Sequence, residues 1–125
     1  ELIAQMKIDS QKDMMLSAKK IYAMGCGAVL VKGGHYGGMP IDILYDGNGF
    51  YKYSSPRINT KNTHGTGCTL SSAITAFLAK GNSIQQSVLL GKRYVYNAIK
   101  NSLEIGKGHG PLHHFYDYYS MKGFE

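Results

Sequence analysis

The chain has 125 residues, a formal net charge of +6 and a hydrophobic fraction of 43%, which is typical of one globular domain or part of one. No apolar run approaches the roughly 18 residues that a membrane-spanning helix needs, so no transmembrane segment is predicted. The first residue is Glu1 and no secretion leader is visible. We therefore expect a processed chain, or a piece of a longer one, in the cytoplasm.

The positive residues are scattered along the chain. Their longest runs are the pairs Lys19-Lys20 and Lys92-Arg93, and the aromatic residues do not interleave with them as in nucleic-acid-binding proteins. A small anionic ligand, such as a nucleotide, explains the charge better than a nucleic acid. Cys26 and Cys68 are too few for a secreted disulfide framework, so we expect free thiols in a reducing compartment.

The first half of the chain predicts a helix followed by short strands, as in an α/β fold. Glycine is frequent, 16 of 125 residues, and it clusters between the periodic segments. Residues 10–24 predict a helix that ends at Gly25. The continuous apolar run 28–31 predicts a buried strand, expected to be parallel to its neighbours. Residues 41–45 and 50–54 flank a turn rich in Asp, Asn and Gly and predict a hairpin near a sheet edge.

Two further helices are predicted in the second half. Ser83 and Gln86 form a capping box that opens the last helix, and Gly91 within its apolar stripe indicates a close helix crossing. The Gly-, His- and Tyr-rich tail, 106–125, is not assigned to an element. The preceding helix, 66–80, ends before Gly81, and its expected buried stripe comprises Leu70, Ile74, Phe77 and Leu78.

The strongest chemical signal is the segment 62–69, Asn-Thr-His-Gly-Thr-Gly-Cys-Thr, which leads directly into a predicted helix. Gly65 and Gly67 allow a tight turn that brings backbone N–H groups toward a ligand, and a helix N-terminus attracts anions. A thiolate is favoured at that position, so Cys68 could be a base, a nucleophile or a redox thiol. The structural alternative is a glycine-rich turn with a small buried cysteine. Neither a Walker P-loop nor a dinucleotide fingerprint occurs.

A second candidate site follows the predicted strand 28–31. Lys32 precedes two glycines at the carboxyl end of that strand, where open α/β sheets bind ligands. Its ammonium group could contact a phosphate, or it could be a surface lysine that closes the strand. His35 is interpreted as a turn residue.

Three weaker candidates lie in the second half of the chain. Lys92 is one position from Gly91 and could point toward a ligand or toward solvent. His109, His113 and His114 match no standard metal-site spacing, so no metal site is predicted there.

Three motifs, in order, resemble the hydroxymethylpyrimidine/phosphomethylpyrimidine kinases of thiamine biosynthesis, a branch of the ribokinase-like superfamily. They are 32–35 (Lys-Gly-Gly-His), 62–73 (Asn-Thr-His-Gly-Thr-Gly-Cys-Thr-Leu-Ser-Ser-Ala) and 108–116 (Gly-His-Gly-Pro-Leu-His-His-Phe-Tyr). Sugar kinases of the superfamily have Asp where this chain has Cys68. The resemblance covers nearly the whole chain and implies the C-terminal portion of a three-layer α/β/α sandwich.

The resemblance also implies roles for individual residues. Cys68 matches the catalytic base that takes the proton from the substrate hydroxymethyl group. Lys32 matches the lysine that contacts the nucleotide phosphates, and Lys92 lies in a segment similar to one that lines the nucleotide site. ATP and Mg²⁺ are the implied cofactors. The anion hole for the γ-phosphate is matched by Gly65, Thr66 and Gly67.

Members of this family are about twice as long as this chain, and the resemblance implies that the N-terminal half, with most of the pyrimidine pocket, is missing. We expect residues 1–125 to be a single partial domain, the nucleotide-binding half, with an exposed sheet edge where the absent strands would pair. The implied substrate is hydroxymethylpyrimidine and then its monophosphate, and a homo-oligomer is expected. The alternatives are a pyridoxal kinase, a catalytically incomplete nucleotide-binding fragment and a basic nucleic-acid binder.

Overall fold

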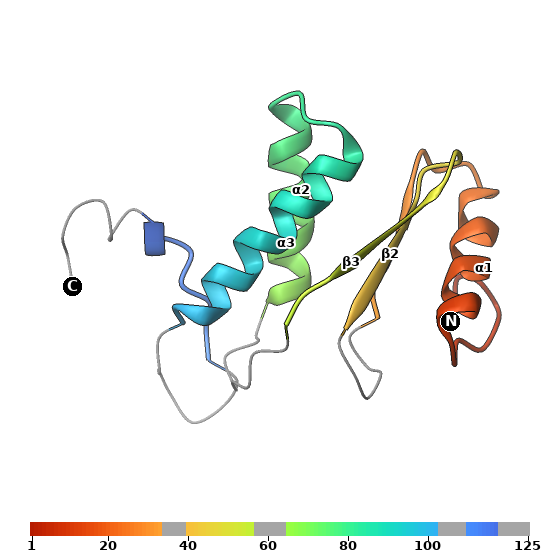
Figure 1. The fold of residues 1–125 in the computed structure, drawn as a ribbon, viewed down its shortest axis with the longest axis horizontal. Helices are drawn as coiled ribbons and strands as arrows, with labels where there is room; N and C mark the ends of the chain where they lie inside the picture. Colours follow the sequence, from red (N-terminus) through yellow and green to blue (C-terminus); the bar gives the residue numbers. More distant parts are fainter. Residues whose placement is uncertain (34–39, 57–64, 103–109, 118–125) are drawn as a thin grey trace. The chain divides into compact units, whose positions relative to one another are not determined.

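The computed structural model describes residues 1–33, 40–56, 65–102 and 110–117, which belong to two compact units (Figure 1). The first unit, Glu1–Arg57, contains a helix and three strands, and the second unit, Ile58–Glu125, contains two helices. Helices and a small sheet confirm the predicted α/β class. Within the described residues, no helix combines the length and apolarity of a membrane span. His35, His64 and His109 lie outside the described residues.

Helix α1 (Gln11–Tyr22) begins and ends close to its predicted limits. The hydroxyl of Ser10 accepts a hydrogen bond from the N–H of Asp13, which caps the first turn. Beyond the last turn Gly25 has φ +106°, a conformation that favours glycine. Met14 and Ala18 are buried on one side of the helix and form much of the core of this unit with Ile43 and Leu44.

The sheet is antiparallel, with strand order β1-β2-β3. Strand β1 (Val29–Val31) pairs with β2 (Ile41–Tyr45), and β2 pairs with β3 (Phe50–Ser54). The prediction that the first strand runs parallel to its neighbour is therefore wrong. Only nine residues, 32–40, connect β1 to β2, whereas a parallel connection needs a crossover of a dozen or more.

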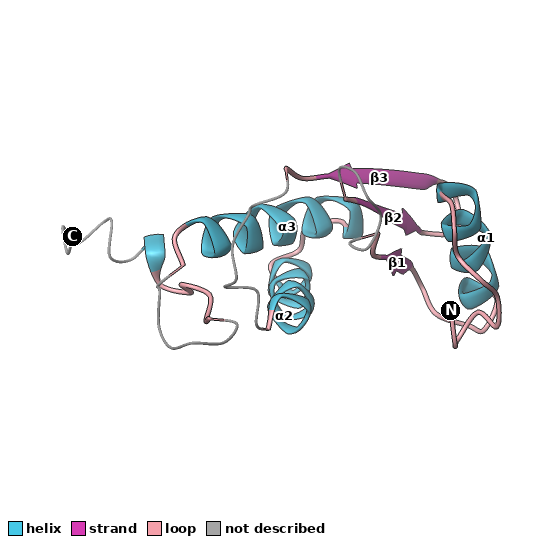
Figure 2. Cartoon of the chain, turned by 90° about the horizontal axis from the view of Figure 1, so that it is seen from below, coloured by secondary structure: helices cyan, strands magenta, loops and turns pink. Residues whose placement is uncertain are grey.

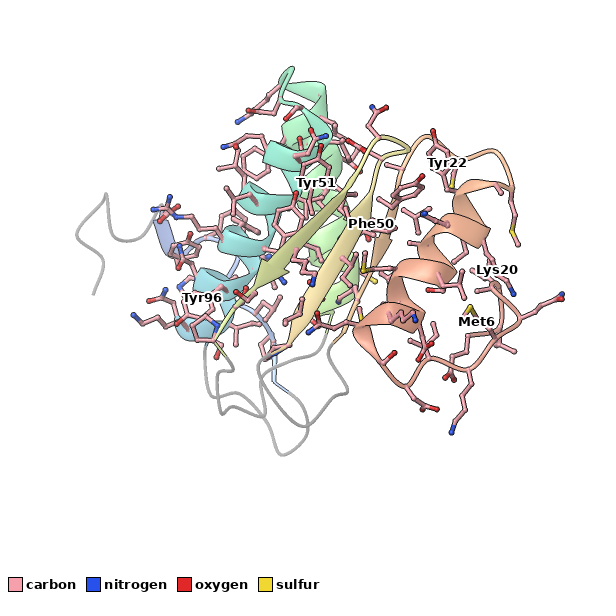
Figure 3. The ribbon with its side chains drawn as sticks, turned by 45° about the vertical axis from the view of Figure 1, so that its right-hand side comes forward. Met6, Lys20, Tyr22, Phe50, Tyr51 and Tyr96 are labelled. Carbon is pink, nitrogen blue, oxygen red and sulfur yellow. The ribbon has the colours of Figure 1, made fainter. Side chains whose placement is uncertain are left out.

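The hairpin between β2 and β3 is confirmed, but of these two strands β3 alone lies at an edge of the described sheet. Strand β2 is central and has three consecutive buried residues, Asp42 to Leu44, so it does not alternate as an edge strand would. The turn is closed by Asp46, whose carboxylate accepts hydrogen bonds from the N–H groups of Asn48 and Gly49, both at 2.9 Å. The end of α1 packs on this turn through the ring of Tyr22, which lies near Phe50 in Figure 3.

In the second unit, helix α2 (Thr66–Ala79) crosses helix α3 (Ile84–Lys100), as Figure 2 shows. The close crossing predicted at Gly91 is confirmed, because a Cβ there would lie 3.0 Å from Cγ1 of Ile74. Leu70 is buried at this contact, but Leu78, expected to be buried, is 41% exposed. Ser83 caps α3 by accepting from the N–H of Gln86, as predicted.

Candidate functional site

The N-terminus of α2 differs from those of the other two helices. Its N-cap, Gly65, has a left-handed conformation (φ +78°, ψ +7°), which glycine adopts without steric penalty. The carbonyl oxygen of Gly65 accepts the N–H of Thr69 at 2.9 Å, which starts the helix. No side chain caps this terminus, whereas the hydroxyls of Ser10 and Ser83 cap α1 and α3. Within the part of the chain that the structure describes, no side chain therefore accepts a hydrogen bond from the first N–H groups of α2.

None of the described residues crowds this terminus. A Cβ placed on Gly65 or on Gly67 would meet none of their atoms within 4 Å beyond the adjoining chain. The first turn of α2 contains no acidic side chain. Because the helix dipole places partial positive charge at its N-terminus, the free N–H groups and the open space favour an anion such as a phosphate. Negative charge that develops during a reaction would be stabilised in the same way.

Cys68 is the third residue of α2 and carries an exposed, free thiol. The structural alternative, a small buried cysteine, is therefore wrong. Together with Gly65, Thr66 and Gly67, this residue forms one continuous helix start, as the motif predicted. The thiol stands next to the N–H groups that could hold a phosphate, so it is placed to exchange a proton with a group bound there.

A hollow of about 490 Å³ begins at Cys68 and continues along α2. Tyr94 of α3 and His114 form its other side, and the sequence analysis gave neither residue a role of its own, although both lie in segments that resemble the family. The hydroxyl of Tyr94 donates to the carbonyl oxygen of His114 at 3.1 Å, and the two rings stack with centroids 6.4 Å apart. Burial raises the pKa of Tyr94 above 10, and Tyr116 and Asp117 add to the shift, so the phenol stays neutral at physiological pH. The hollow therefore has a mostly apolar lining, which also includes the charged side chain of Lys80.

Lys32 lies in the first unit, directly after β1, and is exposed. The following residue, Gly33, is held by the buried carboxylate of Asp42, which accepts its N–H at 3.0 Å. A side chain at Gly33 would overlap the carbonyl oxygen of Ile41. Asp42 is thus a positioning residue for Lys32 that the sequence analysis did not identify, although a charged residue inside an apolar strand was a usable signal.

The remaining candidates lie on α3 and the tail. Lys92 is half-buried. On a regular helix it lies about 200° around the axis from Tyr94, which is nearly the opposite side of α3 from the residue that lines the hollow. The N–H of His113 donates to the carbonyl oxygen of Ala98 at 3.1 Å, which attaches the tail to α3. Within the part of the chain that the structure describes, no group of three or more His, Cys, Asp or Glu side chains could hold a metal ion.

Comparison with known proteins identifies one family. A family model described as phosphomethylpyrimidine kinase matches residues 1–113. The hydroxymethylpyrimidine/phosphomethylpyrimidine kinase of Bacillus subtilis is 44% identical over 117 residues, which cover 92% of this chain and 43% of that protein. Residues 1–125 thus match less than half of the relative's length.

Solved structures of pyridoxal kinases share the fold. The ADP complex of the Bacillus subtilis enzyme matches with a TM-score of 0.82 at 36% identity, covering 90% of this chain and 45% of that one. The Staphylococcus aureus enzyme with AMP-PCP and pyridoxal matches with a TM-score of 0.84 at 34% identity, covering 90% and 43%. The ribokinase-like fold expected from the sequence motifs is confirmed by these matches.

Proposed function

Because the chain belongs to the phosphomethylpyrimidine kinase family, we propose that it forms the nucleotide-binding part of an ATP-dependent phosphotransferase. The acceptor is the hydroxymethyl group of hydroxymethylpyrimidine and then its monophosphate, which leads to thiamine diphosphate. The observation that carries the proposal is the uncapped start of α2, where Gly65, Gly67 and the exposed thiol of Cys68 adjoin. The identity of 44% with the Bacillus subtilis kinase supports the pyrimidine acceptor.

In the proposed reaction, the substrate hydroxymethyl oxygen forms a bond to the γ-phosphorus of ATP. The bond from that phosphorus to the β–γ bridging oxygen breaks, and ADP leaves. Cys68, as the thiolate, accepts the proton of the attacking hydroxyl group. The N–H groups at the start of α2 hold the oxygens of the transferring phosphoryl group, because phosphoryl transfer depends chiefly on positioning and charge stabilisation.

The two lysines are proposed to bind the nucleotide. Lys32 is exposed at the end of β1 on a backbone that Asp42 holds, so its ammonium group is available to neutralise phosphate charge. Lys92 is proposed as a second contact on α3. Mg²⁺ is expected to accompany ATP, but the described residues offer no carboxylate cluster to hold it, and no step above depends on a metal held by this chain.

A second candidate acceptor is pyridoxal. The solved structures with TM-scores of 0.82 and 0.84 are pyridoxal kinases, which supports the same scaffold for that substrate. The identity of 34–36% with those enzymes is lower than the 44% with the pyrimidine kinase, so the pyrimidine remains the first proposal.

The test is to incubate the chain with Mg·ATP and either hydroxymethylpyrimidine or pyridoxal and to detect the phosphorylated product by mass spectrometry. ATP binding is measured in parallel by equilibrium dialysis. Phosphorylated pyrimidine is expected where a complete acceptor site forms, and ATP binding without product would restrict the chain to the nucleotide-binding part. Product from pyridoxal alone would establish the second candidate, and absence of both binding and product would refute the proposal.

A further inference from the structure

The loop of the hairpin between β2 and β3 contains a chemically reactive pair of residues. Asn48 is the one asparagine of the sequence that a glycine follows. The backbone nitrogen of the next residue can attack an asparagine side chain, and glycine leaves that approach unhindered because it has no Cβ. Asn48 is exposed, so water reaches its side chain. The loop therefore holds a position at which an amide group can be lost without the help of an enzyme.

The reaction involves only these two residues and water. The backbone nitrogen of Gly49, on losing its proton, forms a bond to Cγ of Asn48. The bond from Cγ to Nδ2 breaks, and ammonia leaves with that proton. Water then opens the resulting five-membered succinimide ring at either of its carbonyl groups. The product at position 48 is aspartate or isoaspartate; each adds a negative charge, and isoaspartate also adds one carbon atom to the backbone.

The carboxylate of Asp46 opposes the first step of this reaction. It accepts the N–H groups of Asn48 and Gly49, both at 2.9 Å. The nitrogen that has to lose its proton therefore donates that proton to a negatively charged oxygen, and the nitrogen anion would form beside the same charge. The hydrogen bond also restrains rotation of the peptide group between the two reacting residues. The loop thus contains the reactive pair and the group that holds it in check.

We propose that Asn48 is a deamidation site that the carboxylate of Asp46 restrains in the folded chain, independently of any phosphoryl transfer. The modified loop would fit poorly. Gly47 packs against the hydroxyl of Tyr22 without room for a Cβ, and Phe50 is held by its pairing with β2. An additional backbone carbon between these two fixed points has to displace one of them. The isoaspartyl form should therefore have a lower melting temperature than the native chain.

The test follows the amide-to-acid mass change at Asn48 by peptide mass spectrometry during incubation at neutral pH and physiological temperature. Asp46→Ala should speed the modification by about tenfold, because hydrogen bonds to a charged acceptor are worth at least that factor. Alanine is used because asparagine before Gly47 would create a second reactive pair. Asp117→Ala removes an exposed carboxylate from the second unit and should leave the rate unchanged. Circular dichroism establishes that each variant is folded.

Two further measurements separate the site from its restraint. In urea the native chain should be modified faster than when folded, and at the same rate as Asp46→Ala, because the hydrogen bonds of the loop are then absent. Gly49→Ala should nearly stop the modification without disturbing the fold, since the nearest described atom to a Cβ there is the hydroxyl oxygen of Tyr51, at 4.0 Å. Asn97, inside α3, is the internal reference and should stay intact. A folded Asp46→Ala chain modified no faster than the native one would overturn the restraint, and an unmodified Asn48 in urea would overturn the site.

Discussion

The backbone N–H of Gly33 donates a 3.0 Å hydrogen bond to the carboxylate of Asp42, which is 5% exposed. This bond joins the end of β1 to the neighbouring strand β2 just after Lys32. Since a side chain at Gly33 would overlap the carbonyl oxygen of Ile41, the backbone at this point has little room to move. The position of the candidate phosphate-binding lysine therefore depends on a residue ten positions later in the chain.

Removing this acceptor should destabilise the first unit. Asp42→Ala leaves the N–H of Gly33 buried without its partner, so the free energy of unfolding should fall by about 1.5–3 kcal/mol. Asp42→Asn keeps a carbonyl acceptor of similar shape and should lose less than half of that amount. Urea unfolding followed by circular dichroism measures both. Equal losses in the two variants would show that the charge, and not the hydrogen bond, is what matters at this position.

Local signals in the sequence predicted most of the fold. The caps at Ser10 and Ser83 and the turn at Asp46 are properties of neighbouring residues, so helix starts and the hairpin were found at the expected places. The direction of β1 was predicted wrongly, because its apolar run 29–31 does not specify which strand lies beside it. Leu78 continues the helical period of Leu70, but nothing among the described residues covers it, so periodicity alone predicted burial wrongly.

The candidate site, like the fold, has a part that the sequence predicted and a part that only the structure identified. The helix start from Gly65 to Cys68 could be predicted because its chemistry resides in consecutive residues. Tyr94 and His114 reach the same hollow from α3 and the tail, and this depends on packing that spacing does not encode. Asp42 holds the backbone next to Lys32 only because β1 and β2 pair, which residue spacing does not show. Its place in an apolar strand nevertheless indicated a special role.

Gly91 should not tolerate a side chain. Ala is favoured over Gly in a helix by about 1 kcal/mol, but a Cβ here would lie 3.0 Å from Cγ1 of Ile74 and 3.4 Å from its backbone nitrogen. We expect Gly91→Ala to be destabilising by about 1 kcal/mol despite that gain, and Gly91→Val by about 2–3 kcal/mol. In an Ile74→Ala background the penalty of Gly91→Ala should disappear, which thermal unfolding of the double mutant checks. An additive result would contradict the contact.

Lys32→Ala should weaken nucleotide binding by about tenfold, or ~1.4 kcal/mol, because it removes a positive charge from the phosphates. Lys12→Ala, which removes an exposed lysine from α1, is the matched control and should leave the affinity unchanged. Calorimetric titration with ADP at low and high salt gives a second criterion, since screening should weaken the native chain more than the Lys32 variant. Equal affinities for the native chain and both variants would make Lys32 a residue that only ends the strand.

The cap of α1 should make stability depend on pH. The hydroxyl of Ser10 donates to Asp13 at 2.7 Å, and this bond, followed by one from the N–H of Asp9, lowers the pKa of Asp13 below 3.8. A lowered folded-state pKa stabilises the fold above the unfolded-state value, and this gain is lost as the pH falls through the folded-state value. The native chain should therefore exceed Asp13→Asn in melting temperature near neutral pH, with the difference vanishing in strong acid. A difference that is constant with pH would contradict this role for the carboxylate.

Cys68→Ala should abolish phosphoryl transfer and leave nucleotide affinity within about twofold, because the thiol is proposed to act on the acceptor hydroxyl and not on the phosphates. Substitution at an exposed position should also leave folding intact. Cys26→Ala removes the other exposed thiol and should change neither quantity. The measurements are product formation by mass spectrometry and ADP binding by calorimetry, in the chain or in the complex in which transfer is observed. If Cys68→Ala weakened binding as much as transfer, the residue would shape the phosphate site rather than accept the proton.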